Sequence, residues 1–296
     1  MSTLLIVTSS TRPASPAAGD TYFETDTNKI IVWSGSAWKE YQDNGRLYSD
    51  SDITGLSPRL WLDGGNGDFY TDAAKGTQVT ANNAFVGCWA DRSGNGFDFA
   101  ETTESLQPNI ITNVGRVNNT GLIYGGDRLT FTGTSSSDTS TNMTVFMIFR
   151  YGRLDGSYII QTSDSSTRAR TVKSGDNYAV QFLPFANSSN FNTAYSTANT
   201  AKLMEDTCLM GIRVDNSANT TEVFFNGGSA VGSTTAGSGS FLKNTITTEL
   251  FDETSSEDPS ILLDFMVFPT NLSNANMDTV YSYLSKKYDV TVTAVS

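Results

Sequence analysis

The sequence contains no histidine, the side chain that enzymes use most often for proton transfer near neutral pH. This absence removes the usual catalytic triads and the histidine-containing zinc sites, and leaves catalysis by carboxylates alone. Charged residues are also scarce, because Asp, Glu, Lys and Arg together make up only 17% of the chain. Ser, Thr, Asn and Gly must therefore form much of the surface, a composition typical of extracellular and virion β-proteins.

Basic residues are few, with 19 Lys and Arg against 31 Asp and Glu, and the net charge is −12. No dense Lys/Arg cluster occurs, so we expect no binding to nucleic acid. Long hydrophobic runs are absent as well. The run from Leu4 to Val7 is too short for a signal peptide, and no segment approaches the ~18 apolar residues of a membrane span. We therefore expect no membrane insertion.

Cysteine is also scarce, with Cys88 and Cys208 the two in the chain. They could pair, but both lie in apolar, strand-like segments, where a buried free thiol is the more common state. The cysteines therefore do not identify a redox compartment.

The first pattern that is present is a meander of three short strands, at residues 22–25, 29–33 and 37–41, separated by turn-forming residues. A sheet of this size cannot bury enough apolar surface to be stable alone. It is nevertheless rich in aromatic residues: Tyr22, Phe23, Trp33, Trp38 and Tyr41. We predict that these five side chains contact a neighbouring chain of an assembly.

The remaining chain predicts an all-β sandwich in which many short strands are separated by turn clusters. We place an N-terminal arm and meander at residues 1–45, a polar linker at 46–55 and the sandwich at 56–296. Residues 144–149 are apolar at successive positions, so we expect a central strand covered on both faces.

One surface helix is predicted near the C-terminus, with Ser273 as its N-cap and Lys286 and Lys287 in its last turn, where they complement the helix dipole. The apolar residues at helical spacing are Met277, Val280, Tyr281, Leu284 and Tyr288. We expect this helix to cover one end of the sandwich, followed by a last strand at 290–295.

Several motifs match a family pattern in order. They are "LWLDGGNG" (60–67), "CWADRSGNGFDF" (88–99), "QPNIITN" (107–113), "GDRLTF" (126–131), "MTVFMIFR" (143–150), "VFFNG" (223–227) and "DFMVFPTNLSNANMDTVYSYLSKKYDV" (264–290). Residues 56–296 thereby resemble the concanavalin A-like lectin/glucanase jelly roll in its laminin G-like form. The resemblance implies an antiparallel jelly-roll sandwich and a role in binding carbohydrate.

The meander is similar to a short β-segment of tailed-phage virion proteins that serves in attachment. This resemblance implies a non-enzymatic bacteriophage structural protein at the virion surface, assembled in the host cytoplasm, as a capsid decoration or tail fibre protein. Residues 1–45 would dock on other capsid or tail proteins while the jelly roll faces outward for host attachment. We also expect a homo-oligomer, formed through the docking site or β-surface contacts because no heptad stretch occurs.

Catalytic carboxylates of jelly-roll glucanases alternate along one strand, as retaining hydrolysis requires. The nearest match is Glu249, Asp252 and Glu253, whose spacing places Glu249 and Asp252 on opposite faces of a strand. We therefore predict no enzymatic activity. The alternative is a free carbohydrate-binding module, or one that hydrolyses glycans with carboxylates from distant strands.

Two loops offer hard oxygen ligands for Ca²⁺, through Asp63, Asn66 and Asp68 and through Asp91, Ser93 and Asn95. Neither completes a calcium loop ending in Glu, so turn chemistry is the default and we predict no metal or other cofactor.

A possible glycan platform combines aromatic rings with amide groups: Phe185, Asn187, Asn190, Phe191 and Tyr195. One ring face can stack on a pyranose while the amides bind its hydroxyl groups. The same aromatic residues would also suit a core or a subunit interface.

Overall fold

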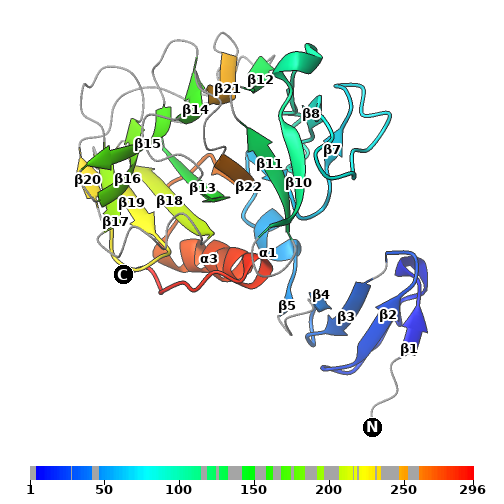
Figure 1. Ribbon diagram of the computed structural model, residues 1–296. Helices are drawn as coiled ribbons and strands as arrows, with labels where there is room; N and C mark the ends of the chain where they lie inside the picture. The colour runs from blue at the N-terminus through cyan, green and yellow to red at the C-terminus, as the bar shows by residue number, and fades with distance from the viewer. Residues whose placement is uncertain are drawn as a thin grey trace.

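The computed structural model shows a small N-terminal sheet beside a larger β-sandwich (Figure 1). It describes residues 5–27, 29–41, 47–114, 119–124, 127–132, 142–150, 158–162, 168–174, 177–183, 192–196, 207–215, 217–218, 220–230, 232–234, 247–252 and 260–296. Among these residues, no helix is long and apolar enough to cross a membrane.

The small sheet has five strands in the described residues and contains the three predicted by the sequence. In spatial order they are β1 (Leu5–Val7), β2 (Thr21–Glu24), β3 (Lys29–Trp33), β4 (Trp38–Tyr41) and β5 (Leu47–Tyr48). Strand β1 is parallel to β2, and the other pairs are antiparallel. A 3-10 helix at Ser9–Thr11 follows β1. The N-terminal arm thus adds a strand to the predicted meander.

Within residues 46–55, expected to be a linker, the described residues form β5 of the small sheet and a short helix, α1 (Ser51–Thr54). Ile53 is fully buried in a core that α1 shares with the C-terminal helix. The ammonium group of Lys39 in β4 lies 2.8 and 2.7 Å from the two carboxylate oxygens of Asp52 in α1. An ion pair therefore connects the small sheet to a helix that packs on the sandwich.

The sandwich consists of two antiparallel sheets, as predicted. One contains β10 (Asn109–Val114), β11 (Asn119–Tyr124), β22 (Ser260–Phe268), β13 (Met143–Arg150), β18 (Cys208–Asp215), β19 (Thr220–Phe225) and β20 (Gly232–Thr234) in this order, with β6 (Leu60–Asp63) also paired to β22. The other contains β17 (Asn192–Ser196), β16 (Asn177–Leu183), β15 (Arg168–Ser174), β14 (Tyr158–Thr162), β21 (Thr247–Asp252), β12 (Leu129–Thr132), β9 (Phe99–Ala100), β8 (Cys88–Trp89) and β7 (Phe69–Tyr70). A 3-10 helix spans Glu104–Leu106.

Strand β13 confirms the prediction of a central strand covered on both faces, because it lies between β22 and β18. Val145 and Met147 point into the core between the two sheets, whereas Phe146 and Ile148 belong to a second, outer core. All four side chains are at most 2% exposed. Because successive side chains of a strand point to opposite faces, this one strand contributes side chains to both cores.

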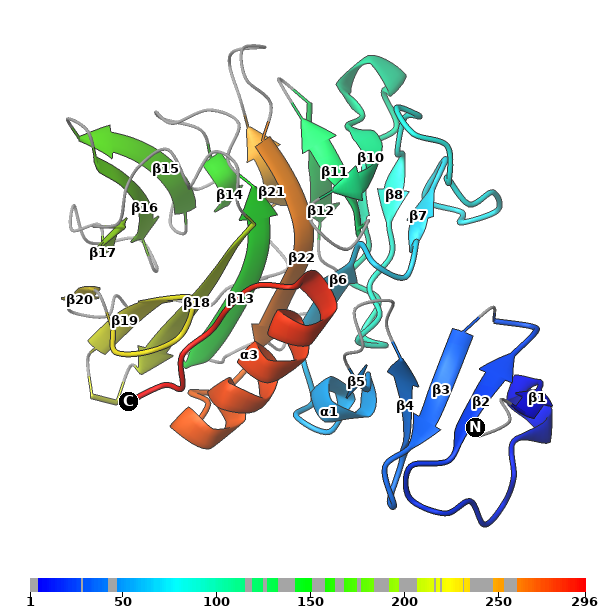
Figure 2. The same ribbon diagram turned by 60° about the horizontal axis from the view of Figure 1, so that its bottom comes forward.

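The C-terminal helix α3 (Asn274–Tyr288) is confirmed, but it lies across the outer face of the first sheet rather than over one end (Figure 2). It covers the outer core with Met277, Tyr281 and Leu284, which are at most 1% exposed. The segment after it forms only an isolated bridge, between Thr293 and Gly227. The predicted last strand is therefore wrong.

Ser273 begins α3 as predicted, since its hydroxyl oxygen accepts a hydrogen bond from the backbone nitrogen of Asn276 at 3.3 Å. Replacing Ser273 with alanine should destabilise the protein by about 1 kcal/mol, because a helix N–H loses its acceptor. Ser273→Asp retains an acceptor and should keep the free energy of unfolding close to that of the native protein. Urea unfolding of both variants tests this, and equal losses would contradict a capping role.

The two cysteines are free and buried, which confirms the expectation from their apolar surroundings. Burial raises the pKa of the Cys88 thiol to about 12, so this thiol stays protonated and unreactive at neutral pH.

Candidate functional site

The aromatic residues predicted for docking lie on two opposite faces of the small sheet. Directly paired residues share a face. By this rule Tyr22, Ile31, Trp33 and Trp38 lie on one side, which we call the Trp face, whereas Phe23 lies on the other. The ring centroid of Trp38 lies 5.4 Å from Tyr22 and 5.2 Å from Trp33. These three rings therefore pack against one another within the sheet.

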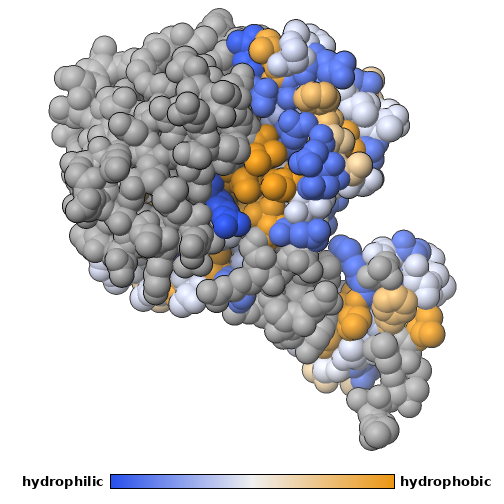
Figure 3. Space-filling model, viewed as in Figure 1, coloured by the Kyte–Doolittle hydropathy of each residue, from blue (hydrophilic) through white to orange (hydrophobic). Residues whose placement is uncertain are grey.

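The opposite side, which we call the Ile face, carries an apolar row across the strands. Ile6 pairs with Phe23, Phe23 pairs with Ile30, and the row of paired positions continues through Tyr41 to Leu47. Ile6 is 71% exposed, and Phe23 and Ile30 are half-buried. Figure 3 shows hydrophobic residues at the surface of the small sheet. A row of this kind is suited to burial against another protein.

Most of the predicted glycan platform lies outside the described residues. This applies to Phe185, Asn187, Asn190 and Phe191, whereas Tyr195 lies in β17, an edge strand of the second sheet in the described residues. Of the carboxylates considered for catalysis, Glu249 and Asp252 are in β21, and Glu253 lies outside the described residues.

The second candidate calcium loop uses its oxygens within the fold. One carboxylate oxygen of Asp91 accepts hydrogen bonds from the backbone nitrogens of Trp61 and Ser93, both at 2.9 Å. The other accepts from the Ser93 hydroxyl at 2.7 Å and from the Phe97 nitrogen at 3.0 Å. Asp91 thus stabilises the turn that follows β8.

The first candidate loop contributes to a buried ionic cluster that sequence analysis missed. Asp63 in β6 and Asp264 in β22 are directly paired positions, and Lys287 of α3 lies between their carboxylates. The ammonium nitrogen contacts Asp63 Oδ1 and lies 3.0 Å from Asp264 Oδ2. All three residues are at most 2% exposed. Lys287 therefore points into the outer core rather than toward solvent, and the predicted dipole role describes only Lys286.

The two carboxylates of this cluster differ in their hydrogen bonding. Asp63 also accepts from the backbone nitrogen of Gly65 at 2.8 Å and from the Asn66 amide. Asp264 Oδ2 also accepts from the Tyr288 hydroxyl at 3.0 Å, but its Oδ1 has no hydrogen-bond partner among the described residues. Burial raises the pKa of Asp264 to about 7, despite the nearby Lys287. The pKa of Asp63 is lowered, because Lys287 and Arg92 outweigh its burial.

Arg92 extends the charged network toward the small sheet. Its guanidinium lies 3.5 Å from Asp63, 3.7 Å from Asp68 and 2.6 Å from Asp50, the residue just before α1. The Tyr283 hydroxyl also donates to Asp50 at 3.0 Å. Burial raises the pKa of Asp68 to about 6. The oxygens of Asp63 and Asp68 thus face protein cations, and no group of three or more Cys, Asp or Glu side chains that could hold a metal occurs in the described part of the chain.

No family model matches this sequence, and no curated protein matches it. Solved structures do resemble its fold. The binding domain of botulinum neurotoxin DC in complex with SialylT has 13% sequence identity and a TM-score of 0.52, covering 77% of this chain and 51% of that one. The botulinum neurotoxin serotype D ligand binding domain in complex with N-acetylneuraminic acid has 15% identity and a TM-score of 0.51, covering 79% and 52%.

A third structure, the botulinum neurotoxin DC binding domain in complex with rat synaptotagmin II, has 14% identity and a TM-score of 0.51, covering 80% and 53%. The chain spans about half the length of these structures. At such identities the likeness shows the fold alone, a β-sandwich.

Proposed function

We propose that this protein is a non-enzymatic structural protein of a tailed-phage virion, displayed on the capsid or tail, whose sandwich binds glycans of the host surface. The observation that carries the proposal is the combination of a lectin-like sandwich with a small separate sheet whose Ile face is apolar and partly exposed. The sandwich supplies a binding fold, and the Ile face supplies a surface for docking on a neighbouring virion protein.

The composition supports a surface protein of a particle, because histidine is absent and charged residues are few. The similar solved structures are described as binding domains, two of them in complex with SialylT or N-acetylneuraminic acid. Within the predicted glycan platform, Tyr195 lies in β17, and the other members are outside the described residues. An aromatic ring of this platform would offer one face on which a sugar ring could stack.

Docking is tested by replacing Ile6 and Phe23 with glutamate in the full chain. Charges on the Ile face should prevent burial against a partner, so the double variant should fail to join purified particles. Phe85→Glu is the matched control, because Phe85 is a 46% exposed hydrophobic residue of the sandwich. Protein bound to particles is measured by sedimentation and immunoblotting, with circular dichroism to verify folding. Normal incorporation of a folded double variant would refute docking through this face.

Glycan binding is tested with the full chain on a glycan array, with and without calcium. Binding that is lost in Phe191→Ala and Tyr195→Ala would support the platform. A free carbohydrate-binding or hydrolytic module is the second candidate function, and it predicts glycan binding or cleavage without association with particles.

A further inference from the structure

Phe85 is a large hydrophobic residue of the sandwich that is nevertheless 46% exposed. The segment that carries it runs beside β10, where the backbone nitrogen of Val86 donates to Pro108 at 2.8 Å and that of Ile110 donates to Ala84 at 2.9 Å. Ala84 and Val86 belong to the core between the two sheets. Phe85, which lies between them, therefore points to the outer face of the first sheet, on a backbone that is held in place.

Phe85 begins a row of three chemically different side chains across this outer face, which we call the Phe85 row. Phe85 pairs with Asn109 of β10 through an isolated bridge, and Asn109 pairs with Ile123 of β11. Directly paired residues share a face, and neighbouring strands lie about 5 Å apart. Asn109 and Ile123 are half-buried. An aromatic ring, an amide and an aliphatic group thus follow one another within about 10 Å.

The amide group of Asn109 is fixed by one of its two ends. Its Nδ2 donates to the backbone oxygen of Asn83 at 2.8 Å, whereas its Oδ1 accepts no hydrogen bond from a described residue. An amide oxygen can accept two hydrogen bonds. The Phe85 row therefore contains an acceptor whose orientation is set before a ligand arrives, which lowers the cost of binding a hydrogen-bond donor.

The surroundings of the Phe85 row favour an uncharged ligand. The row contains no charged side chain, and the next paired positions on the same face, Ile111 and Gly121, are also uncharged. Figure 3 shows hydrophobic residues gathered on this part of the sandwich, over β10 and β11. A charged ligand would find no partner of opposite sign in these rows, and an anion would also be repelled by the net charge of −12.

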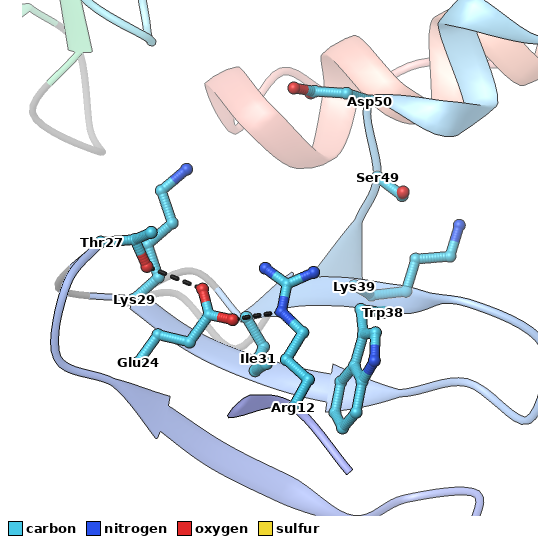
Figure 4. Close-up of a pocket in the computed structure, with 9 residues that line it drawn as sticks. All are labelled: Arg12, Glu24, Thr27, Lys29, Ile31, Trp38, Lys39, Ser49 and Asp50. Atoms are coloured by element: carbon cyan, nitrogen blue, oxygen red, sulfur yellow. Dashed lines mark hydrogen bonds and ion pairs between the residues drawn. The ribbon is translucent and has the colours of Figure 1, made fainter. Parts of the chain in front are cut away.

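The polar pocket on the Trp face of the small sheet is different, because its charged groups pair with one another. Arg12 Nε donates to Glu24, which also accepts from the Thr27 hydroxyl at 2.8 Å (Figure 4). The Lys39 ammonium lies 2.7 Å from Asp52. These pairs contribute to the structure of the small sheet.

An N-acetylhexosamine presents three groups that match the Phe85 row in the same order. Its pyranose ring has an apolar face that stacks on aromatic rings, its acetamido nitrogen donates a hydrogen bond, and its methyl group is apolar. With the sugar ring over Phe85, the N–H would meet Oδ1 of Asn109 and the methyl group would contact Ile123. We propose that the Phe85 row binds a neutral N-acetylhexosamine residue of a glycan. This inference rests on the glycan binding proposed above, and it names a sugar class and a site for it.

The test is isothermal titration of the full chain with N-acetylglucosamine, N-acetylgalactosamine and glucose. We expect at least one N-acetylated sugar to bind with a dissociation constant of about 1 mM. Glucose should bind at least about tenfold more weakly, because it lacks both the N–H donor and the methyl group. Added NaCl should leave the affinity unchanged, since no charge pair forms.

Phe85→Ala should weaken binding of the N-acetylated sugar at least about tenfold, because the stacking surface is lost, whereas Phe85→Trp should retain binding. Asn109→Ala should also weaken it. Ile6→Ala is the matched control, since Ile6 is the other exposed large hydrophobic residue in the described part of the chain. Tyr195→Ala should leave the affinity unchanged, because Tyr195 lies in the second sheet. Circular dichroism verifies that each variant is folded.

The outcomes separate this inference from the proposed function. If the native chain binds no glycan on the array, both fail. If it binds glycans, but folded Phe85→Ala binds the N-acetylated sugars as tightly as the native chain, or glucose binds equally well, this inference alone is overturned. A folded Phe85→Glu variant that no longer joins particles would identify the Phe85 row as a protein interface and would overturn it as well.

Discussion

Replacing Lys287 with alanine is expected to destabilise the protein by about 3–5 kcal/mol, because the change leaves the buried Asp264 without its cation and leaves Asp63 with Arg92 alone. Asp63 and Asp264 face each other across paired strands, and both are at most 1% exposed. Like charges in such positions repel unless a cation lies between them. The measurement is the free energy of unfolding in urea at pH 7.

The chain offers a matched control at the neighbouring position. Lys286 has the same side chain in the same helical turn, but it is exposed. Lys286→Ala should therefore change the free energy of unfolding by less than about 0.5 kcal/mol. Similar losses in both variants would mean that helix propensity or net charge, rather than the buried ion pairs, explains the effect of Lys287.

A further variant separates the contribution of the ion pairs to stability from the contribution of side-chain packing. Replacing Lys287, Asp63 and Asp264 together by apolar residues of similar volume removes the charges along with the cation. Such replacements are often neutral or stabilising. We therefore expect the triple variant to recover most of the stability lost in Lys287→Ala, and a triple variant as unstable as the single one would contradict this account.

The strands and the long helix could be predicted because their signals are local. The uninterrupted apolar run in β13 requires cover on both faces, and Ser273 precedes a helical apolar stripe; the structure has both features. The position of α3 on the sheet could not be predicted in this way. It depends on which residues of β6, β18 and β22 share the outer face, and this is set by pairing between segments far apart in sequence.

The role of Lys287 had a signal that was overlooked. Lys287 lies three residues after Leu284 and seven after Val280, so it falls on the apolar stripe of the helix, whereas Lys286 does not. A lysine on a buried stripe needs a carboxylate partner. The identity of that partner is a tertiary property, since Asp63 lies 224 positions away. The division of the N-terminal aromatic residues between two faces is a tertiary property in the same way, because it depends on the register in which β2, β3 and β4 pair.

The arrangement of the small sheet also changes how its aromatics are interpreted. Tyr22, Trp33 and Trp38 provide packing for one another on the Trp face, so replacing the two tryptophans with alanine would disturb the sheet as well as any interface. Ile6 is 71% exposed and can be altered at little cost to folding. Variants of the Ile face therefore separate docking from stability more cleanly than variants of the tryptophans.

Acidification from about pH 8 to about pH 5 should raise the stability of this protein, which is the second large effect we expect. Burial raises the folded-state pKa of Asp264 to about 7 and that of Asp68 to about 6, from an ordinary value of 3.8. Between the two values, the folded protein binds a proton that the unfolded chain does not. Each such group adds stability with a slope of at most about 1.4 kcal/mol per pH unit as the pH falls through this window.

The gain in stability on acidification should end near the ordinary pKa of a carboxylate, and further acidification should lower the stability. Lys287 and Arg92 lower the pKa of Asp63 in the folded protein. The stability that Asp63 contributes is therefore present above its pKa in the unfolded chain, and it is lost as the pH falls through its pKa in the folded protein. We therefore expect a stability maximum on the acidic side of neutrality, at about pH 4–5. Urea unfolding midpoints and slopes measured across this range locate the maximum.

The Asp264→Asn variant tests whether the gain in stability comes from this buried carboxyl group or from the general relief of charge repulsion in an acidic protein. An amide does not titrate, and Lys287 retains Asp63 as its partner. The variant should therefore be at least as stable as the native protein at about pH 8, and it should gain less on acidification. Glu104→Gln removes an exposed carboxylate and should leave the shape of the pH profile unchanged. Parallel profiles for the native protein and Asp264→Asn would show that the gain comes from net charge alone, and that the carboxyl group of Asp264 is ionised within the outer core throughout this pH range.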